Sequence, residues 1–227
     1  MRNERSFPRS TAEFDSQKSI RKLENTWAFK YLQVNKYLNR PIASLIVRAV
    51  YGTGVTPNHL TYFSFVIGLA GAYFFFRGKP SAFVAGGILA QVSSIVDCAD
   101  GMLARAKNQM TEFGAYLDLF LDRVTDFFLL AGCMVGYFRY AGRLNLLVLG
   151  LVTMALYFLQ TSLYYLMKNY VLDNKRGETA ENRGWFMFLM FVFAAVNRLD
   201  YGIYVLFVVS VTTNFFLTVN FFRLRKT

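Results

Sequence analysis

The sequence predicts an all-α integral membrane protein: a bundle of six transmembrane helices preceded by an amphipathic juxtamembrane helix. Hydrophobic residues form 55% of the 227 residues and aromatic residues 18%, a composition too apolar for an ordinary soluble domain. Several apolar runs reach the length of about 20 residues that spans a bilayer. The first 20 residues are charged and polar, so we see no cleavable signal with an apolar core.

The region before the first span has a polar start and then a basic amphipathic stretch at 19–38. Such a stretch is typical of a helix that lies on an anionic membrane surface, and packing against the rest of the domain is a compatible alternative. We assign residues 1–40 to this polar N-terminus and surface helix, and residues 41–227 to one membrane domain. Four apolar residues mark the helical spacing: Leu23, Trp27, Tyr31 and Val34.

Local start and stop signals delimit the helices that follow. Pro41 opens a short helix that ends near Tyr51, just before Gly52. Thr56 is a natural N-cap for the first span, with Pro57 at the first helical position. Turns or polar links separate the later apolar runs. The six spans are predicted at 57–76, 81–106, 112–140, 144–170, 185–196 and 202–222.

The charge distribution predicts the orientation of the bundle. The net charge is +11, and the lysines and arginines stand mostly before and between the apolar runs. Membrane orientation explains this excess better than nucleic-acid binding, so we expect no nucleic-acid partner. Six spans place both termini on one side, and the basic residues favour a cytoplasmic N-terminus with the second and fourth links on the same side.

Four aspartates stand inside the second and third spans, although one charged residue at the bilayer centre costs about 3 kcal/mol on insertion scales. If these spans form an antiparallel hairpin that turns near 108–111, Asp97 lies level with Asp122, and Asp100 lies level with Asp118. Spacings of three and four residues place each helix's pair on one face. The sequence therefore predicts that four carboxylates converge on one pocket.

Converging carboxylates repel one another or bind protons unless a cation neutralises them. Oxygen ligands favour Mg²⁺, Mn²⁺ or Ca²⁺ over zinc, and two such ions bridged by four carboxylates form a site suited to phosphoryl transfer. A proton or cation pathway is the alternative for the aspartates. Gly101 and Ala104 leave the helix face open, Gly114 lies one turn before Asp118, and Arg105 suits a diphosphate. Helix packing is the alternative for the glycines.

These residues together resemble the signature of the CDP-alcohol phosphotransferase (CDP-alcohol phosphatidyltransferase) family. Eight residues at fixed spacing match every signature position: Asp97-x-x-Asp100-Gly101-x-x-Ala104-Arg105, then Gly114, Asp118 and Asp122. A bundle of six spans after an amphipathic helix is similar to that family, so the likeness covers most of the chain. The segment Thr56-Pro-Asn-His-Leu-Thr61 also resembles the start of the family's first span.

The resemblance implies a reaction. A phosphoalcohol group passes from a CDP-alcohol, such as CDP-diacylglycerol, CDP-archaeol or CDP-inositol, to an acceptor hydroxyl, and CMP leaves. The products are phospholipids or inositol phosphodiesters. The family also implies a homodimer, and the site is expected near the cytoplasmic end of the spans.

The resemblance further implies the role of each residue at the site. The four aspartates, Asp97, Asp100, Asp118 and Asp122, hold two Mg²⁺ or Mn²⁺ ions, and Asp122 also serves as the general base. The residues that shape the nucleotide pocket are Gly101, Ala104, Arg105 and Gly114, with Asn58 and Thr61 reaching it from the first span.

The acceptor is less well defined by the sequence. Basic residues near the fourth link are candidates for binding a phosphorylated acceptor such as an inositol phosphate or glycerol phosphate, and plain orientation charge is the alternative. Arg123 and Asp126 lie outside the signature and are expected to pair with partners across helices. The candidates for acceptor binding are Lys168, Lys175, Arg176 and Arg183.

Three other functions are compatible with aspartates inside a membrane. An ion-coupled transporter would move ions without releasing CMP, and it leaves the Gly-x-x-Ala-Arg spacing unexplained. An intramembrane prenyltransferase also uses aspartate clusters with Mg²⁺, but such enzymes resemble larger bundles with two separated acidic motifs. An inactive family member that serves as a scaffold is the third, although every signature position is intact.

Overall fold

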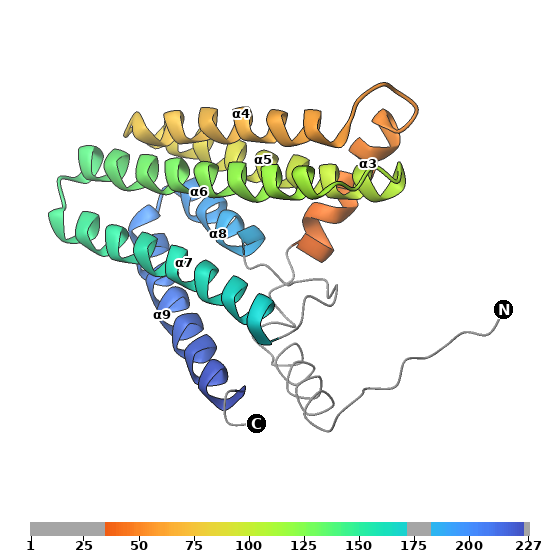
Figure 1. Ribbon diagram of the computed structural model, residues 1–227. Helices are drawn as coiled ribbons and strands as arrows, with labels where there is room; N and C mark the ends of the chain where they lie inside the picture. The colour runs from red at the N-terminus through yellow and green to blue at the C-terminus, as the bar shows by residue number, and fades with distance from the viewer. Residues whose placement is uncertain (1–34, 172–182, 225–227) are drawn as a thin grey trace.

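Helices make up most of the described part of the chain (Figure 1). Its computed structural model describes residues 35–171 and 183–224, and no strand occurs among them. The predicted surface helix at 19–38 therefore lies almost wholly outside the described residues. The described elements are the π-helix η1 (Asn35–Asn39) and the α-helices α3 (Arg40–Val50), α4 (Pro57–Phe76), α5 (Pro80–Ala106), α6 (Glu112–Ala141), α7 (Leu144–Val171), α8 (Arg183–Ala195) and α9 (Leu199–Leu224).

The helix starts and ends follow the local signals in the sequence. At the start of α4, the backbone N–H of Thr56 donates to His59 Nδ1 over 3.2 Å, so this lone histidine closes the first helical turn. Thr111 caps α6, where its Oγ1 accepts a hydrogen bond of 2.9 Å from the N–H of Gly114. Gly142 ends α6 with a φ of +65°, a conformation that glycine adopts without steric cost.

Four of the described helices are long and apolar enough to cross a membrane. These segments are Pro57–Phe76, Pro80–Ala106, Leu144–Leu163 and Leu199–Val219. Helix α6 is 30 residues long but carries several charged residues, and α8 is apolar but has only 13 residues, or about 20 Å at 1.5 Å per residue. The chain is therefore an integral membrane protein made of helices.

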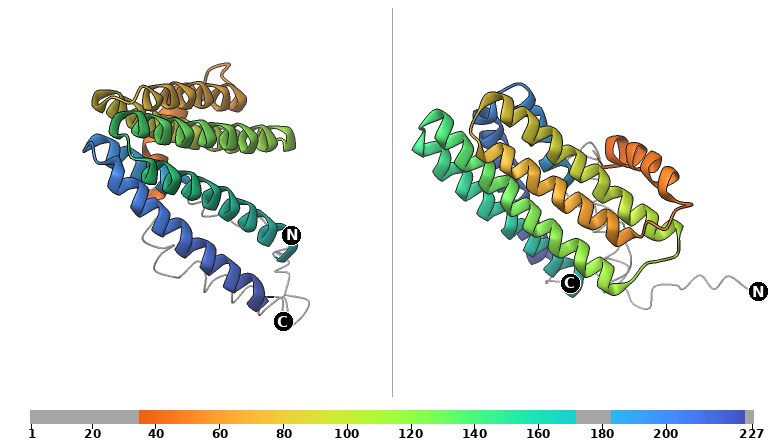
Figure 2. Two further views of the ribbon diagram at one scale, coloured as in Figure 1. Left: turned by 90° about the vertical axis from the view of Figure 1, so that its left-hand side faces the viewer. Right: turned by 90° about the horizontal axis from the view of Figure 1, so that it is seen from above.

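Helices α4, α5 and α6 form one side of the molecule, with α4 packed against both of the others (Figure 2). Helices α7 and α9 pack together on the other side, and α8 connects the two sides through contacts with α5 and α9 (Figure 1). Within the described residues, α5 and α6 are not a closely packed pair of backbones. The two acidic helices therefore face each other with room for side chains between them.

The close approach of α4 and α6 depends on glycine. A Cβ added to Gly132 would lie 2.5 Å from the carbonyl oxygen of Ala72, and one added to Gly136 would overlap the carbonyl oxygen of Phe75. The two glycines lie four residues apart, on one face of α6. Such small residues let helix backbones touch where packing, rather than water exclusion, holds membrane helices together.

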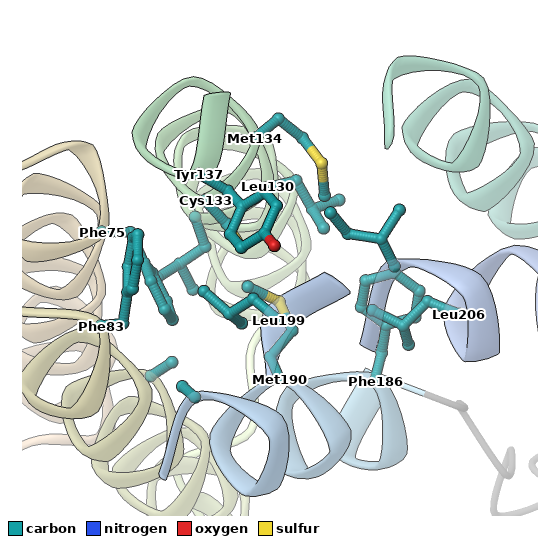
Figure 3. Close-up of a cluster of buried hydrophobic side chains, with 14 of the residues drawn as sticks. Phe75, Phe83, Leu130, Cys133, Met134, Tyr137, Phe186, Met190, Leu199 and Leu206 are labelled. Atoms are coloured by element: carbon teal, nitrogen blue, oxygen red, sulfur yellow. The ribbon is translucent and has the colours of Figure 1, made fainter. Parts of the chain in front are cut away.

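Two apolar clusters flank the middle of the bundle. The larger cluster combines side chains from the end of α4, the start of α5, the second half of α6, and parts of α7, α8 and α9 (Figure 3). The smaller cluster packs α3 against the start of α4 and the end of α5, through residues that include Ala43, Leu60, Ala99 and Leu103. On α5, Asp97 and Asp100 lie among the residues of the smaller cluster, and on α6 the acidic residues precede those of the larger cluster.

A buried polar contact joins the segment before α3 to the middle of α5. Asn39 is fully buried; its Nδ2 donates to Ser94 Oγ over 3.0 Å, and its Oδ1 accepts a hydrogen bond of 2.7 Å from Gln91 Nε2. Both ends of the amide are therefore bonded to one helix. The arrangement fixes the entry of the chain into α3 relative to α5.

Candidate active site

Three aspartates of the predicted site come together between α5 and α6. Asp97, Asp100 and Asp118 each present one carboxylate oxygen, and these oxygens all lie within 4.8 Å of one another. Asp100 is buried, whereas Asp97 and Asp118 are half-buried. As the sequence predicts for two helices that face each other, the carboxylate of Asp118 on α6 lies beside those of Asp97 and Asp100 on α5.

Asp122 reaches the same region through an arginine. Nη1 of Arg183 lies 2.8 Å from Asp97 Oδ2 and 2.9 Å from Asp122 Oδ1. This one nitrogen therefore contacts both α5 and α6. It does so where the sequence predicts that Asp97 and Asp122 lie opposite each other. The carboxylate of Asp122 faces this guanidinium and is not within the group of three oxygens.

A second set of contacts holds this arginine from the other side. Nε of Arg183 donates to Asp126 Oδ1 over 3.0 Å, and Asp126 Oδ2 accepts a hydrogen bond of 2.7 Å from the hydroxyl of Tyr157 on α7. Nη1 of Arg123 lies 3.4 Å from Asp126 Oδ2 and donates to Thr161 Oγ1 over 3.2 Å. These contacts confirm the expectation that Arg123 and Asp126 each pair with residues on other helices.

The sequence named Arg183 only as one of four basic candidates near the fourth link and did not reveal its carboxylate partners. Its position, directly before an apolar run, resembles that of any basic residue at a helix end. Of the other three candidates, Lys175 and Arg176 lie outside the described residues, and the side chain of Lys168 is not described. Only Arg183 can therefore be placed relative to the acidic group.

The donor set of the acidic group fits a hard divalent cation. Every candidate ligand is a carboxylate oxygen, the donor type that Mg²⁺ and Mn²⁺ prefer. Oδ1 of Asp97 is buried and makes no hydrogen bond among the described residues. A buried carboxylate oxygen without a partner is costly, and a cation would satisfy it.

The residues predicted to contact a nucleotide lie around this group. Thr61 of α4 donates its hydroxyl to Asp100 Oδ2 over 2.6 Å. A Cβ added to Gly114 would lie 3.3 Å from Asn58 Oδ1, so the starts of α4 and α6 meet here.

The other three predicted residues, Gly101, Ala104 and Arg105, lie near the C-terminal end of α5. A Cβ added to Gly101 would lie 3.6 Å from a guanidinium nitrogen of Arg105, and this arginine is exposed. Ala104, directly before Arg105, is half-buried. The structure thus brings Asn58 close to Gly114 and Thr61 into contact with Asp100, and it leaves Arg105 exposed.

Known proteins are similar in sequence to part of this chain. The bifunctional IPC transferase and DIPP synthase of Archaeoglobus fulgidus is 40% identical over 98 residues, which are 43% of this chain and 19% of that protein. The archaetidylinositol phosphate synthase of Pyrococcus horikoshii is 35% identical over 91 residues, or 40% of this chain and 47% of that protein. The chain thus spans less than half the length of these curated relatives.

The fold is similar to that of a solved membrane protein. The phosphatidylinositol phosphate synthase of Mycobacterium tuberculosis, crystallised with CDP-DAG bound, matches with a TM-score of 0.58 and 24% identity, over 78% of this chain and 89% of that chain. The CDP-alcohol phosphatidyltransferase family matches residues 54–219, which is well over half of the sequence. The chain is therefore a member of the CDP-alcohol phosphatidyltransferase family, as the spacing of its aspartates predicts.

Proposed function

We propose that this protein transfers a phosphoalcohol group from a CDP-alcohol to an acceptor hydroxyl, with release of CMP, in the synthesis of phospholipids or inositol phosphodiesters. The observation that supports this most is the group of carboxylate oxygens from Asp97, Asp100 and Asp118, within 4.8 Å of one another in a chain of this family. Neither a transporter nor a prenyltransferase accounts for the complete family signature around these aspartates.

Asp97, Asp100, Asp118 and Asp122 would hold two Mg²⁺ or Mn²⁺ ions. When bound, such ions offset the negative charge of a diphosphate and of departing CMP. A structure of the M. tuberculosis relative in complex with manganese and citrate agrees with this choice of metal. Asp122 accepts the proton of the acceptor hydroxyl as that oxygen attacks the phosphorus carrying the alcohol, and the bond from this phosphorus to the CMP oxygen breaks.

The nucleotide would occupy the side of the site formed by α4 and the starts of its neighbours. Gly101, Ala104 and Gly114 leave room there, and Arg105 is exposed beside Gly101, where its guanidinium has space to contact a diphosphate. Asn58 and Thr61 would contact the nucleotide from α4. The roles follow from their placement beside the carboxylates and from their match to the family signature.

The acceptor would be a polyol phosphate, with inositol phosphate as the leading example. Arg183 places a buried guanidinium against Asp97 and Asp122, whereas Thr61 is bonded to Asp100. Guanidinium groups bind phosphate through paired, charge-assisted hydrogen bonds. The names of the P. horikoshii relative and of a phosphatidylinositol phosphate synthase from Mycobacteroides abscessus, 34% identical over 96 residues, support an inositol phosphate acceptor and a lipid donor such as CDP-archaeol or CDP-diacylglycerol.

We further propose that α4 to α9 are the six membrane spans, with the N-terminus and the active site on the cytoplasmic side and two copies forming a homodimer. Helix α3 buries Ala43 and Val47 in the bundle and exposes Ile42, Leu45 and Arg48, which suits a helix at the membrane surface. Cysteine labelling from each side of the membrane tests the orientation, and mass measurement in detergent tests the dimer.

A matrix of donors and acceptors tests the reaction. Purified protein with Mg²⁺ is mixed with CDP-diacylglycerol, CDP-archaeol or CDP-inositol, and with inositol phosphate, glycerol phosphate, inositol or serine. We expect CMP release to require both a donor and an acceptor, to be fastest with a lipid donor and inositol phosphate, and to stop with EDTA. Ion flux into vesicles without CMP release in any combination would instead favour a transporter.

A valine at position 61 tests the metal site from the α4 side. Thr61→Val keeps the shape of the side chain but removes the 2.6 Å hydrogen bond to Asp100. Partners of metal ligands commonly contribute about 10–100-fold to metal affinity, so we expect Mn²⁺ to bind about tenfold more weakly, measured by calorimetry. Thr153→Val is the matched control, because this buried hydroxyl donates only to Leu149 of its own helix. Equal Mn²⁺ affinity in all three proteins would contradict the assignment.

A further inference from the structure

The two ends of the Arg183 guanidinium face different surroundings. Nη1 contacts Asp97 and Asp122, whose side chains are 18% and 11% exposed, so this end points toward the acidic site. Nε contacts Asp126, whose side chain is 0% exposed. Arg183 is thus shared between two carboxylates of the site and one carboxylate outside it.

Asp126 is bonded on both of its oxygens by protein groups. Oδ1 accepts from Arg183 Nε, and Oδ2 accepts from the Tyr157 hydroxyl over 2.7 Å, with Arg123 Nη1 at 3.4 Å. These partners come from α6, α7 and α8, so the carboxylate is a junction of three helices. A buried carboxylate with hydrogen bonds to both oxygens is held in one position, because moving it would leave charged groups unpaired in an apolar interior.

We propose that Asp126, supported by Tyr157, is a positioning residue that holds Arg183 at the wall of the acidic site, where the arginine binds the phosphate of the acceptor. The inference rests on the proposed function for the presence of such an acceptor. Asp126 acts through Arg183 and does not itself touch the substrate.

The need for such a residue follows from the charges around Arg183. Divalent ions held by Asp97 and Asp122 would engage the carboxylates that now face Nη1 and would repel the guanidinium. The bond from Nε to Asp126 is not shared with the site and would keep the guanidinium in place. Nη1 would then be directed at an anionic group that enters beside Asp97 and Asp122.

Asp126→Asn tests this role, since it keeps the shape of the side chain but removes the charge. We expect the KM for inositol phosphate to rise at least about tenfold, while the KM for the CDP-alcohol stays within about twofold. In an Arg183→Gln background, Asp126→Asn is expected to add nothing further to the acceptor KM, because the first change has removed the group that Asp126 positions. A purely structural role would raise both KM values or add to the effect of Arg183→Gln.

Tyr157→Phe is a milder change, and it keeps the proposal testable even if Asp126→Asn fails to fold. It removes the 2.7 Å hydrogen bond to Asp126, together with the longer one of 3.4 Å that the hydroxyl accepts from Arg123 Nη1, and keeps the Asp126 charge. We therefore expect a smaller rise, about threefold, in the acceptor KM alone. Tyr137→Phe is the control: Tyr137 is a buried tyrosine of the same larger apolar cluster, but among the described residues it makes no hydrogen bond to Asp126. Unchanged acceptor KM in Tyr157→Phe, or an equal change in Tyr137→Phe, would overturn the proposal.

A binding measurement separates this inference from the proposed reaction. Calorimetry with inorganic phosphate on the full-length, Mg²⁺-loaded protein reports the anion site without turnover. We expect Asp126→Asn and Arg183→Gln to weaken phosphate binding by the same factor, and Tyr137→Phe to leave it unchanged. If no donor and acceptor pair releases CMP but this pattern holds, the reaction is wrong and the positioning role stands. If CMP is released but Asp126→Asn binds phosphate normally, the positioning role is wrong.

Discussion

Asp122→Asn is expected to lower the rate of CMP release by about 1,000-fold or more while the protein remains folded. A general base contributes about 10²–10⁴-fold to a rate, and this residue is also a proposed metal ligand. Folding is expected to survive because an asparagine oxygen can still accept the hydrogen bond that Arg183 Nη1 makes over 2.9 Å to Asp122 Oδ1. Single-turnover assays of CMP release, with thermal unfolding in detergent alongside, measure both properties.

Asp200→Asn is the matched control for that change. Asp200 also pairs with an arginine, Arg198, at 3.4 Å, but it stands at the start of α9 and belongs to no part of the proposed site. The control variant is expected to turn over at the rate of the unmodified protein. Turnover by Asp122→Asn at the normal rate would refute the assignment of Asp122 as the base.

Gly136→Ala is expected to destabilise the fold, although alanine is the better helix former by about 1 kcal/mol. The new methyl group would overlap the carbonyl oxygen of Phe75, so α4 and α6 would have to separate. Overpacking of this kind costs about 1–3 kcal/mol, and the lost contact would affect both α4 and the helix that carries Asp118 and Asp122. We expect a fall of about 2 kcal/mol in the free energy of unfolding, seen as a lower Tm in detergent.

Gly52→Ala serves as the reference for that substitution. Gly52 lies in the loop before α4, and a Cβ added there meets nothing within 4 Å. The loop variant should unfold at the same temperature as the unmodified protein. An unchanged or higher Tm for Gly136→Ala would mean that the backbones of α4 and α6 do not touch.

Much of the fold could be predicted because its signals are local. Proline at a helix start and a threonine cap each act within a few residues, so the predicted helices that fall within the described residues differ from those in the structure by only a few residues. The meeting of Asp97, Asp100 and Asp118 was also predictable, since a tight turn between two helices fixes which residues lie level. Spacing within each helix then sets the shared face.

The contacts of Arg183 with Asp97, Asp122 and Asp126 could not be predicted in the same way. Arg183 is separated by 57 residues from Asp126 and by 86 from Asp97, and no spacing rule relates positions on helices that are not consecutive. Its contacts depend on how α8 packs against α5, which is decided by side-chain shape across the whole bundle. For the same reason the sequence did not show that α4, rather than α5, is the close neighbour of α6.

The hydrogen bonds of the Asn39 amide connect the start of α3 to α5. Its partners Gln91 and Ser94 stand at three-residue intervals before Asp97, on one stripe of α5. Pulling Asn39 out would strand hydrogen-bonding groups in an apolar interior, at about 1–3 kcal/mol for each. Separating the start of α3 from the bundle therefore breaks hydrogen bonds to the helix that also carries Asp97 and Asp100.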